Sequence, residues 1–315
     1  MKNVFVKNMD FKKLPDEVCA AIGNFDGVHL GHQKLIEECK KHNYKSAVLT
    51  FYPHPSTLLK KIPNYPLVTP IEKKIEIVES MGIDYLIVID FNEDIMNMSK
   101  EDFIQAMKKM GIKSCVCGYD FTFAQYAEGT IKDLDENFEF YEIKKFIYEN
   151  VRVSTTYIRE LISMGDVLEA SKMLGRTFSI KGDVIHGFKN GRKLGFPTAN
   201  VNYTNYFLPQ NGVYFVKVLI DKELYDGMCN IGHNPTVKFQ EDRRMEVNIF
   251  NFDKDIYGKK IEVFFKNRIR GEIKFSSLDE LKAQLNEDRN KCMALSKLEK
   301  NQNLIDLNKN KFVVD

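Results

Sequence analysis

The chain has 315 residues, of which 43% are hydrophobic and 29% are charged, and 46 basic against 44 acidic side chains leave a formal net charge of +2. This length favours about two domains, each large enough to bury its own core. Because the charges nearly balance, no large positive surface indicates nucleic acid as the main partner, whereas a small anionic ligand is compatible with the composition.

Neither export nor membrane insertion is expected. The N-terminal stretch MKNVFVKNMDFKK is interrupted by charges before an apolar signal core can form, and no apolar run approaches the roughly 20 residues of a membrane span. The six cysteines are scattered without C-x-x-C spacing, which is typical of reduced, buried thiols. We therefore expect a cytoplasmic protein with no membrane segment.

Short apolar runs alternate with helical patterns through the first half of the chain. Strands are expected at 17–25, 46–51, 83–90 and 112–120, and helices between them at 32–42, 71–82 and 99–111. This alternation predicts crossover units and a parallel sheet. Ligands of open α/β sheets bind outside the carboxyl ends of the strands, so the bend that joins the first strand to the first helix is placed for a site.

The pattern changes in the second half of the chain. Residues 155–175 predict one or two helices, later runs such as 245–252 alternate with a period of two, and 276–300 has the pattern of an amphipathic helix. We therefore predict an α/β + β fold in two domains. Residues 1–178 form a domain with a parallel sheet, and residues 179–315 form a compact antiparallel β domain that ends in a helix.

The bend AIGNFDGVHLGHQ, residues 21–33, combines features that suit a phosphate. Gly23 and Gly27 permit close backbone approach, and the N-terminus of the new helix offers N–H groups and a positive dipole end. His29 and His32, three apart on the first turn, project to one side, where two imidazoles can stabilise a pentavalent phosphorus transition state. A glycine turn with two solvated or capped histidines is the alternative. Metal ligation is a weaker one, because no convincing third ligand lies nearby.

A second candidate site for phosphate is VSTTYIR, residues 153–159. Ser154, Thr155 and Thr156 can cap a helix whose first N–H groups face a triphosphate, and Arg159 supplies a planar cationic fork. Read without its neighbours, the same stretch also fits a plain capped helix with a surface arginine.

In the second half, GDVIHGFKNGRKLGFPTANV, residues 182–201, carries a third candidate site. The Thr198 hydroxyl and the Asn200 side-chain oxygen are hard donors two residues apart. In an extended chain they share a face, where they can hold a magnesium ion that bridges ATP phosphates. The alternative is a Pro-Thr turn with a solvated Asn. The glycines of this stretch predict either a close-approach loop or hairpin turns: Gly182, Gly187, Gly191 and Gly195.

Several blocks of sequence carry a resemblance to a known family. GNFDGVHLGHQ is followed by TFYPHP at 50–55, GYDFTFA at 118–124 and VSTTYIR, and these resemble the adenylyltransferase half of the bacterial bifunctional riboflavin kinase/FMN adenylyltransferase (FAD synthetase) family. GFPTANV resembles that family's riboflavin kinase signature, and NGVYFV, NIGHNPTV, EVNIFNFDKDIYG and RIRGEIKFSSLDEL follow in its order. The resemblance covers about residues 18–290.

The resemblance implies a Rossmann-like nucleotidyltransferase domain and a small Greek-key β-barrel kinase domain. It implies that His29 and His32 act in adenylyl transfer and that Glu246 is the general base of the kinase. The alternation of MEVNIF places Glu246 on the face opposite Met245. Thr198 and Asn200 are the implied Mg²⁺ ligands. The implied contacts to ATP and flavin are Gly23, Phe25, Asp26, Gly27, Pro53, His54, Asp120, Ser154, Thr155, Thr156 and Arg159, and in the second domain Gly182, Gly195, Thr198 and Asn200.

The expected function is bifunctional. Riboflavin and ATP give FMN and ADP in the C-terminal domain, and FMN and ATP give FAD and pyrophosphate in the N-terminal one, both with Mg²⁺. The expected partners are small-molecule flavins and ATP, with no nucleic acid and no membrane, and self-association is left open. Three alternatives stand beside this reading: another adenylyltransferase, a kinase whose N-terminal half is inactive, and a flavin-binding regulator.

The sequence departs from the family pattern at three positions of the N-terminal half. Tyr52 stands where an acidic residue usually precedes PHP, Ala124 replaces a glycine, and Ala127 falls where an arginine is common. All three lie near the implied flavin and nucleotide loops. They bear on the adenylyltransferase reaction and leave the kinase reaction untouched.

Overall fold

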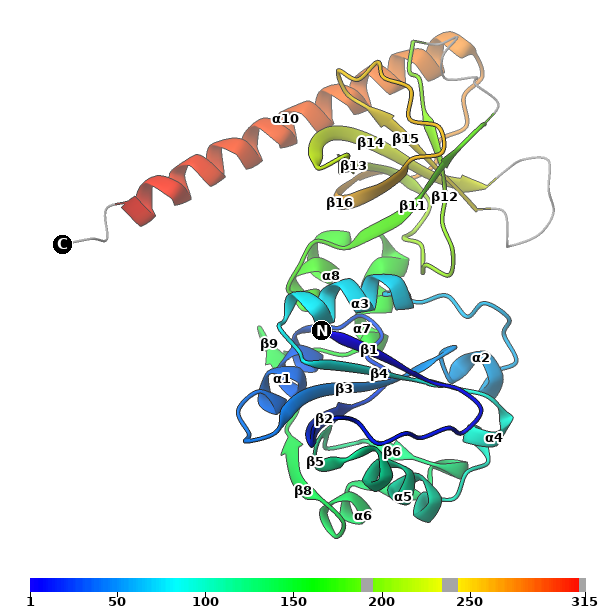
Figure 1. Ribbon diagram of the computed structural model, residues 1–315. Coiled ribbons are helices and arrows are strands. Elements are labelled where there is room, and N and C mark those ends of the chain that lie inside the picture. The colour runs from blue at the N-terminus through cyan, green and yellow to red at the C-terminus, as the bar shows by residue number, and fades with distance from the viewer. Residues whose placement is uncertain (188–194, 234–242, 312–315) are drawn as a thin grey trace. The chain divides into compact units, whose positions relative to one another are not determined.

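A computed structural model describes residues 1–187, 195–233 and 243–311, with side chains as far as residue 301. The chain folds into two compact units, whose helices and strands are labelled in Figure 1. The sheet unit comprises Met1–Ile158, Met173–Gly175 and Asn205–Phe207, and the barrel unit comprises Arg159–Lys172, Arg176–Thr204 and Leu208–Asp315.

Six parallel strands form the sheet of the sheet unit, in the order β1-β4-β3-β2-β5-β8. The four inner strands are those that the sequence predicts, so the parallel sheet is confirmed. The two edge strands were not predicted, because charged and half-exposed residues at an edge hide the apolar pattern. The strands are β1 Lys2–Val6, β4 Tyr85–Asp90, β3 Lys45–Tyr52, β2 Val18–Ile22, β5 Ile112–Gly118 and β8 Glu139–Ile143.

Helices cover both faces of this sheet (Figure 1). Alternate residues of β2 face two separate cores, so that Ile22 packs with the core of α5 and Ala21 with that of α1 and α3. A parallel sheet buried on both faces accounts for strands that are apolar throughout. The helices are α1 Leu30–Cys39, α2 Ser56–Leu59, α3 Ile71–Ser80, α4 Glu93–Met96, α5 Lys100–Met110 and α6 Ile131–Asp135, with a short η1 at Gln125–Ala127. Short strands are β6 Thr122–Phe123, β7 Gly129–Thr130, β9 Ile147–Tyr148 and β10 Val151–Arg152.

Two helices, α7 Thr155–Met164 and α8 Val167–Leu174, follow in the chain. They are separated at Gly165, whose φ of 83° lies in the left-handed region that glycine adopts without strain. A Cβ at this position would lie 2.5 Å from the side chain of Arg268. The stretch that predicted one or two helices therefore forms two.

The barrel unit is a closed antiparallel barrel, in the order β11-β12-β15-β14-β13-β16, which confirms the predicted β domain. Successive residues of a barrel strand point to opposite faces of the sheet. In β13, Tyr214 and Val216 are fully buried on one face, and Val213 and Phe215 pack on the other face with Cys292 of the last helix. The strands are β11 Ser179–Ile185, β12 Ala199–Asn202, β13 Gly212–Ile220, β14 Glu223–His233, β15 Arg243–Ile249 and β16 Lys260–Arg270.

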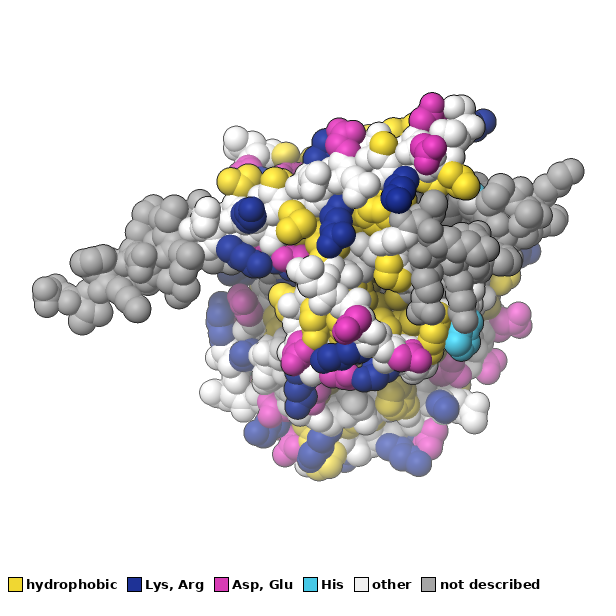
Figure 2. Space-filling view, turned by 90° about the horizontal axis from the view of Figure 1, so that it is seen from above, with side chains coloured by type: hydrophobic (Ala, Val, Ile, Leu, Met, Phe, Trp, Pro, Cys, Tyr) yellow, Lys and Arg dark blue, Asp and Glu magenta, His cyan; other side chains and the backbone are white. Residues whose placement is uncertain are grey.

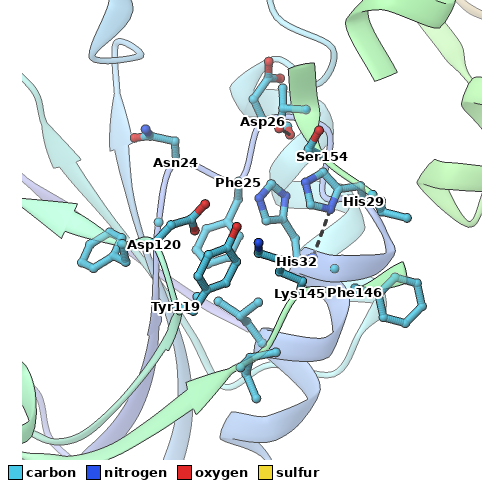
Figure 3. A pocket seen from close by; sticks show the side chains of 18 of the residues that line it. Asn24, Phe25, Asp26, His29, His32, Tyr119, Asp120, Lys145, Phe146 and Ser154 are labelled. Carbon is cyan, nitrogen blue, oxygen red and sulfur yellow. Dashed lines mark hydrogen bonds between the residues drawn. The ribbon is translucent and has the colours of Figure 1, made fainter. Parts of the chain in front are cut away.

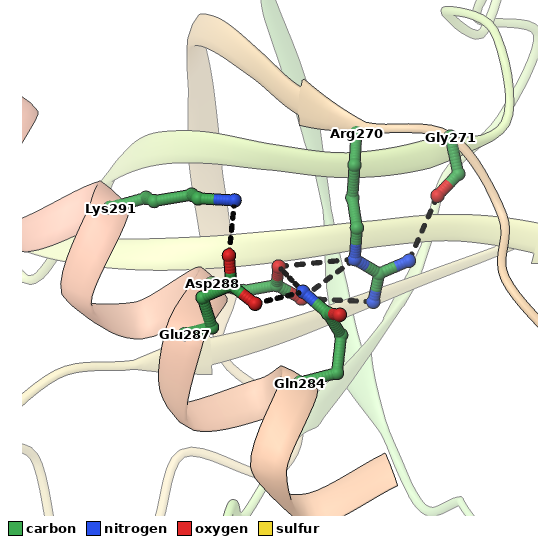
Figure 4. Close-up of polar contacts among 6 residues, drawn as sticks. All are labelled: Arg270, Gly271, Gln284, Glu287, Asp288 and Lys291. Carbon is green, nitrogen blue, oxygen red and sulfur yellow. Dashed lines mark hydrogen bonds and ion pairs between the residues drawn. The ribbon is translucent and has the colours of Figure 1, made fainter. Parts of the chain in front are cut away.

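The last helix, α10 Leu278–Lys311, is held on the barrel by a buried ion pair (Figure 4). Asp288 is 0% exposed, and the Nε of Arg270 donates to both of its carboxylate oxygens at 3.1 and 2.9 Å. Gln284 donates to the same carboxylate at 3.0 Å, and the Nη1 of Arg270 donates to the carbonyl of Gly271 at 2.8 Å. These contacts fix the position of α10 along the barrel.

Basic and acidic side chains are interspersed over the face that Figure 2 shows, in keeping with the small net charge. Within the part of the chain that the structure describes, no helix is long and apolar enough to cross a membrane. The six cysteines are all free and buried, as the sequence predicts.

Candidate functional site

A cavity of about 490 Å³ opens at the carboxyl edge of the parallel sheet, where the sequence predicts the site. It lies between the turn after β2, the segments after β5 and β8, and the first turns of α1 and α7 (Figure 3). The expected residues that line it are Gly23, Phe25, Asp26, His29, His32, His54, Asp120, Ser154 and Thr155. Its described lining does not include Gly27, Pro53, Thr156 or Arg159.

The two histidines form a stacked pair in this cavity. His29 is the N-cap of α1, one position before the first turn on which it was expected, and its Nδ1 accepts a hydrogen bond from the backbone N–H of His32 at 3.2 Å. The ring centroids are 3.5 Å apart and the planes differ by 15° (Figure 3). A Cβ on Gly31 would lie 3.2 Å from the His29 ring, so the glycine between the histidines makes room for the pair.

The 23–28 turn, from Gly23 to Val28, has an unusual backbone. Phe25 and Val28 have φ values of 49° and 40°, and Gly27 has a φ of 91°. A non-glycine residue in the left-handed region costs about 1–3 kcal/mol and persists only where its surroundings hold it. The turn must therefore be fixed from outside.

Side chains from three helices supply that support by donating to backbone carbonyls of the turn. These hydrogen bonds run from Lys74 of α3 to Asn24 at 2.6 Å, from Thr155 of α7 to Asp26 at 2.8 Å, and from Gln33 of α1 to Val28 at 2.9 Å. The sequence suggested Thr155 as a helix cap. In the structure its hydroxyl is bonded to the turn.

The N-terminus of α7 meets the cavity at Ser154. The Ser154 hydroxyl accepts a hydrogen bond from the N–H of Tyr157 at 3.2 Å, which is the geometry of an N-cap. Thr156 is exposed, and Arg159 lies on the same helix one turn after Thr155. Of the three hydroxyl residues proposed as caps, Ser154 is therefore the one that takes this role.

Basic side chains that the sequence analysis did not single out also line the cavity. Lys144, Lys145 and Arg152 follow the edge strand β8, and Arg152 pairs with Asp120 at 2.6 Å. The cationic groups of Lys145 and Arg152 lie 4.9 and 5.2 Å from the centroid of the Tyr119 ring. The cavity is therefore lined by three histidines, three cationic side chains and a helix N-terminus, which suits a polyphosphate.

A second cavity of the sheet unit, about 570 Å³ in volume, is lined mainly by aromatic and apolar side chains. It shares Asn24, Phe121 and Thr122 with the first cavity, so the two adjoin. Its aromatic residues are Phe51, Phe91, Phe103, Phe121, Phe123 and Tyr126. A flat ring system can stack in such a space.

Two of the departures from the family pattern, Ala124 and Ala127, line this aromatic cavity. Ala124 has a φ of 65° and a ψ of −174°, a combination that glycine adopts almost alone. Tyr126 between them is 87% exposed and also has a positive φ, of 51°. Tyr52, the third departure, is half exposed and precedes a cis bond to Pro53.

In the barrel unit the strand register brings two expected site residues together. Asn200 of β12 lies directly opposite Glu246 of β15, and Asn230 of β14 lies opposite Glu246 on its other side. Directly opposite residues project to the same face, so these three side chains form a row across the barrel. Glu246 is half-buried on this face and Met245 is buried on the other, as the alternation predicts.

Thr198 lies just before β12 and lines a cavity of about 550 Å³, whereas Asn200 lines a neighbouring one of about 570 Å³. His186 lines both. A Cβ on Gly187 would lie 2.0 Å from the side chain of Asn200, so this glycine allows the close approach that the sequence suggests.

The other glycines of this stretch have different roles. Gly195 has a φ of 83° with open space around it, so its backbone conformation requires glycine. A Cβ on Gly182 would lie 2.3 Å from the carbonyl of Asn202, so that glycine serves the packing of β11 on β12. Gly191 lies outside the described residues.

Metal ligation by the histidine bend was the weaker alternative for the first site. Over the described residues, no group of three or more His, Cys, Asp or Glu side chains is arranged to hold a metal ion.

A parallel-sheet unit with one cavity that suits a polyphosphate and an adjoining aromatic one, in one chain with a closed β-barrel, is typical of a protein that binds a nucleotide-type ligand. The FAD synthetase family model matches residues 11–157, and the riboflavin kinase model matches residues 174–296.

Relatives cover both halves together. The bifunctional riboflavin kinase/FMN adenylyltransferase of Bacillus subtilis (strain 168) is 42% identical over 287 residues, 87% of this chain and 90% of that one. Its counterpart in Escherichia coli (strain K12) is 34% identical over 292 residues, 89% of this chain and 93% of that one. A crystal structure named as a macrolide-efflux protein from Streptococcus pneumoniae superposes with a TM-score of 0.84 at 32% identity, over 92% of this chain and 98% of that one. The chain belongs to the bifunctional riboflavin kinase/FMN adenylyltransferase family, and riboflavin kinase and FMN adenylyltransferase are its activities.

Proposed function

We propose that residues 1–178 carry out FMN adenylylation and residues 179–315 carry out riboflavin phosphorylation. The observation that carries the first assignment is the pair of adjoining cavities in the sheet unit, one suited to a polyphosphate and one to a flat aromatic ring. Adenylyl transfer to FMN needs this arrangement, because the phosphate at the end of the flavin must reach the α-phosphate of ATP. The shared residues Asn24, Phe121 and Thr122 mark where the two substrates meet.

In the adenylylation step, a phosphate oxygen of FMN attacks the α-phosphorus of ATP. The new P–O bond forms as the bond between the α- and β-phosphates breaks, and pyrophosphate leaves. His29 and His32 stabilise the charge that develops on the α-phosphate oxygens. Lys144, Lys145 and Arg152 neutralise the departing pyrophosphate.

Other residues of the cavity bind and orient ATP in this proposal. Gly23, Phe25, Asp26 and Gly27 shape the turn, and the α7 N-terminus capped by Ser154 offers backbone N–H groups. His54 lines the cavity with its Nδ1 accepting from the N–H of Ser56 at 3.1 Å, which fixes its ring. Pro53, Thr156 and Arg159 stay proposed contacts that the described cavity lining does not include.

In the kinase step, Glu246 accepts the proton of the riboflavin 5′-hydroxyl as its oxygen attacks the γ-phosphorus of ATP. Thr198 and Asn200 offer the hard oxygen donors that magnesium prefers; they line neighbouring cavities that share His186, and Asn200 lies directly opposite the proposed base. Bound Mg²⁺ would neutralise charge on the ATP phosphates. Gly182 and Gly195 shape the backbone around this site.

A cytoplasmic location is part of the proposal, because six free, buried cysteines suit a reducing compartment that also supplies ATP. Flavins and ATP suffice as partners for both reactions. Self-association is a separate question, which sedimentation of the purified chain answers directly.

The test is to incubate the purified chain with riboflavin, ATP and Mg²⁺ and to separate the flavins by chromatography. FMN should appear first and FAD after it. Flavin binding without ATP consumption would favour the flavin-binding regulator. A product that stops at FMN would favour the kinase with an inactive N-terminal half, for which Ala124 and Ala127 in the aromatic cavity are the specific observation.

A further inference from the structure

Lys74 is a buried lysine that neither reaction step uses. It lies on α3 and is 2% exposed, although lysine is among the residues least often buried. Its Nζ donates to the backbone carbonyl of Asn24 at 2.6 Å and to the Oγ1 of Thr50 at 3.2 Å. The Thr50 hydroxyl donates to the same carbonyl at 3.1 Å, so two side chains hold one backbone oxygen.

The backbone oxygen that Lys74 and Thr50 hold is that of Asn24, a residue that lines both cavities of the sheet unit. Asn24 lines both cavities, and it directly precedes Phe25, which has a φ of 49°. A backbone held in this region needs restraint from its surroundings. Lys74 and Thr50 supply the restraint at the first part of the turn, and neither of them is among the residues that line the two cavities.

We propose that Lys74 is a positioning residue for adenylyl transfer. By holding the carbonyl of Asn24, it fixes the 23–28 turn in the shape that receives ATP beside the flavin. The inference rests on the proposed function of this cavity and adds a residue that touches neither substrate.

The charge of Lys74 suits this role. A charged donor makes a stronger hydrogen bond to a carbonyl than a neutral one does. Burial lowers the pKa of Lys74 to about 8, and the nearby carboxylate of Asp26 opposes that shift. The groups that contact it from β3 and the turn, Thr50 and the Asn24 carbonyl, are neutral, so Asp26 is the charge that faces it.

The experiment compares three variants of the full chain. Lys74→Met keeps the unbranched apolar stem of the side chain and removes its donor and charge. Lys73→Met makes the same change one residue earlier and is the matched control: the Lys73 side chain is 16% exposed and pairs with the more exposed carboxylate of Glu76 at 3.2 Å. Thr50→Val removes the second donor and keeps the branched shape. For each variant, kcat and KM for ATP are measured in FMN adenylylation, and riboflavin kinase activity is measured in the same preparation.

Lys74→Met should lower kcat/KM for ATP in adenylylation by about 10- to 100-fold, since small displacements of positioning groups cost this much. Thr50→Val should lower it less, and Lys73→Met should leave it unchanged. Kinase activity should be unchanged in all three. In wild type the ratio of adenylylation to kinase rate should fall as the pH rises through about 8, and this fall should be absent in Lys74→Met.

Normal adenylylation in Lys74→Met, or an equal loss in Lys73→Met, would overturn the inference. If Lys74→Met disrupts the sheet unit by circular dichroism, Thr50→Val decides, and a normal rate in that variant overturns it. Changing His29 and His32 to alanine separates this outcome from failure of the proposed function. If those changes abolish adenylylation while Lys74→Met does not, the cavity assignment stands and the positioning role is wrong.

Discussion

Removal of the Asp288 carboxylate should selectively destabilise the barrel unit. In wild type this fully buried carboxylate accepts from Arg270 and from Gln284. In Asp288→Ala the Arg270 guanidinium keeps its bond to the Gly271 carbonyl and loses its counter-ion. Breaking a buried pair by removing one partner costs about 3–5 kcal/mol, because it leaves a buried charge uncompensated. A domain is stable by only about 5–15 kcal/mol, so this is a large fraction of the total.

The two activities report on the two units separately during urea unfolding. Kinase activity of Asp288→Ala should be lost at a much lower urea concentration than in wild type, while the midpoint for adenylylation should stay close to the wild-type value. Glu287→Ala is the control, because its pair with Lys291 is exposed and a surface pair contributes little. The reasoning would be refuted if Asp288→Ala and Glu287→Ala shifted the kinase midpoint equally.

Three further predictions follow from other parts of the molecule. Thr198→Ala and Asn200→Ala should each weaken riboflavin phosphorylation most at limiting Mg²⁺, and an unchanged Mg²⁺ titration in both would contradict the metal assignment. Between about pH 8 and pH 10.5, Lys74 is protonated in the unfolded chain but has lost its proton in the folded one. The free energy of unfolding of wild type should therefore rise with pH, relative to that of Lys74→Met, by up to about 1.4 kcal/mol per pH unit. If the free energies of unfolding of the two proteins changed in parallel with pH, the prediction would be contradicted. Ala124→Gly should stabilise the sheet unit by about 1 kcal/mol, because it relieves a strained backbone, and a lower midpoint for loss of adenylylation would show that no such strain exists.

The inner strands and the helices of the sheet unit could be predicted because their patterns are long and clear. A fully buried strand such as β2 is apolar throughout, and α5 has an apolar stripe at helical spacing. The edge strands β1 and β8 were missed because exposed polar or charged residues interrupt their apolar pattern: Lys2 and Asn3 in β1, and Glu139 and Glu142 in β8. With β8 unseen, Lys144 and Lys145 could not be placed at the carboxyl edge of the sheet.

Contacts between residues far apart in the sequence were the other limit. In the sequence, Lys74 lies in the run EKKIE and looks like a solvated lysine on an amphipathic helix, yet it is buried against a turn 50 residues earlier. Thr155 looks like a helix cap, yet its hydroxyl bonds to Asp26. Asn200 lies directly opposite Glu246 because of the register in which β12 pairs with β15. The alternation of apolar and polar residues within one strand does not determine that register.

The central claim, that two chemistries occupy two separate units, is tested most directly by measuring both activities in two variants. In the chain with His29→Ala and His32→Ala, FMN should accumulate while riboflavin is still phosphorylated, because a lost transition-state donor costs ~10²–10³ in rate at one site alone. In Glu246→Gln, riboflavin should stay unphosphorylated while added FMN still becomes FAD, since a lost general base costs ~10²–10⁴. Loss of both activities in each folded variant would contradict the account.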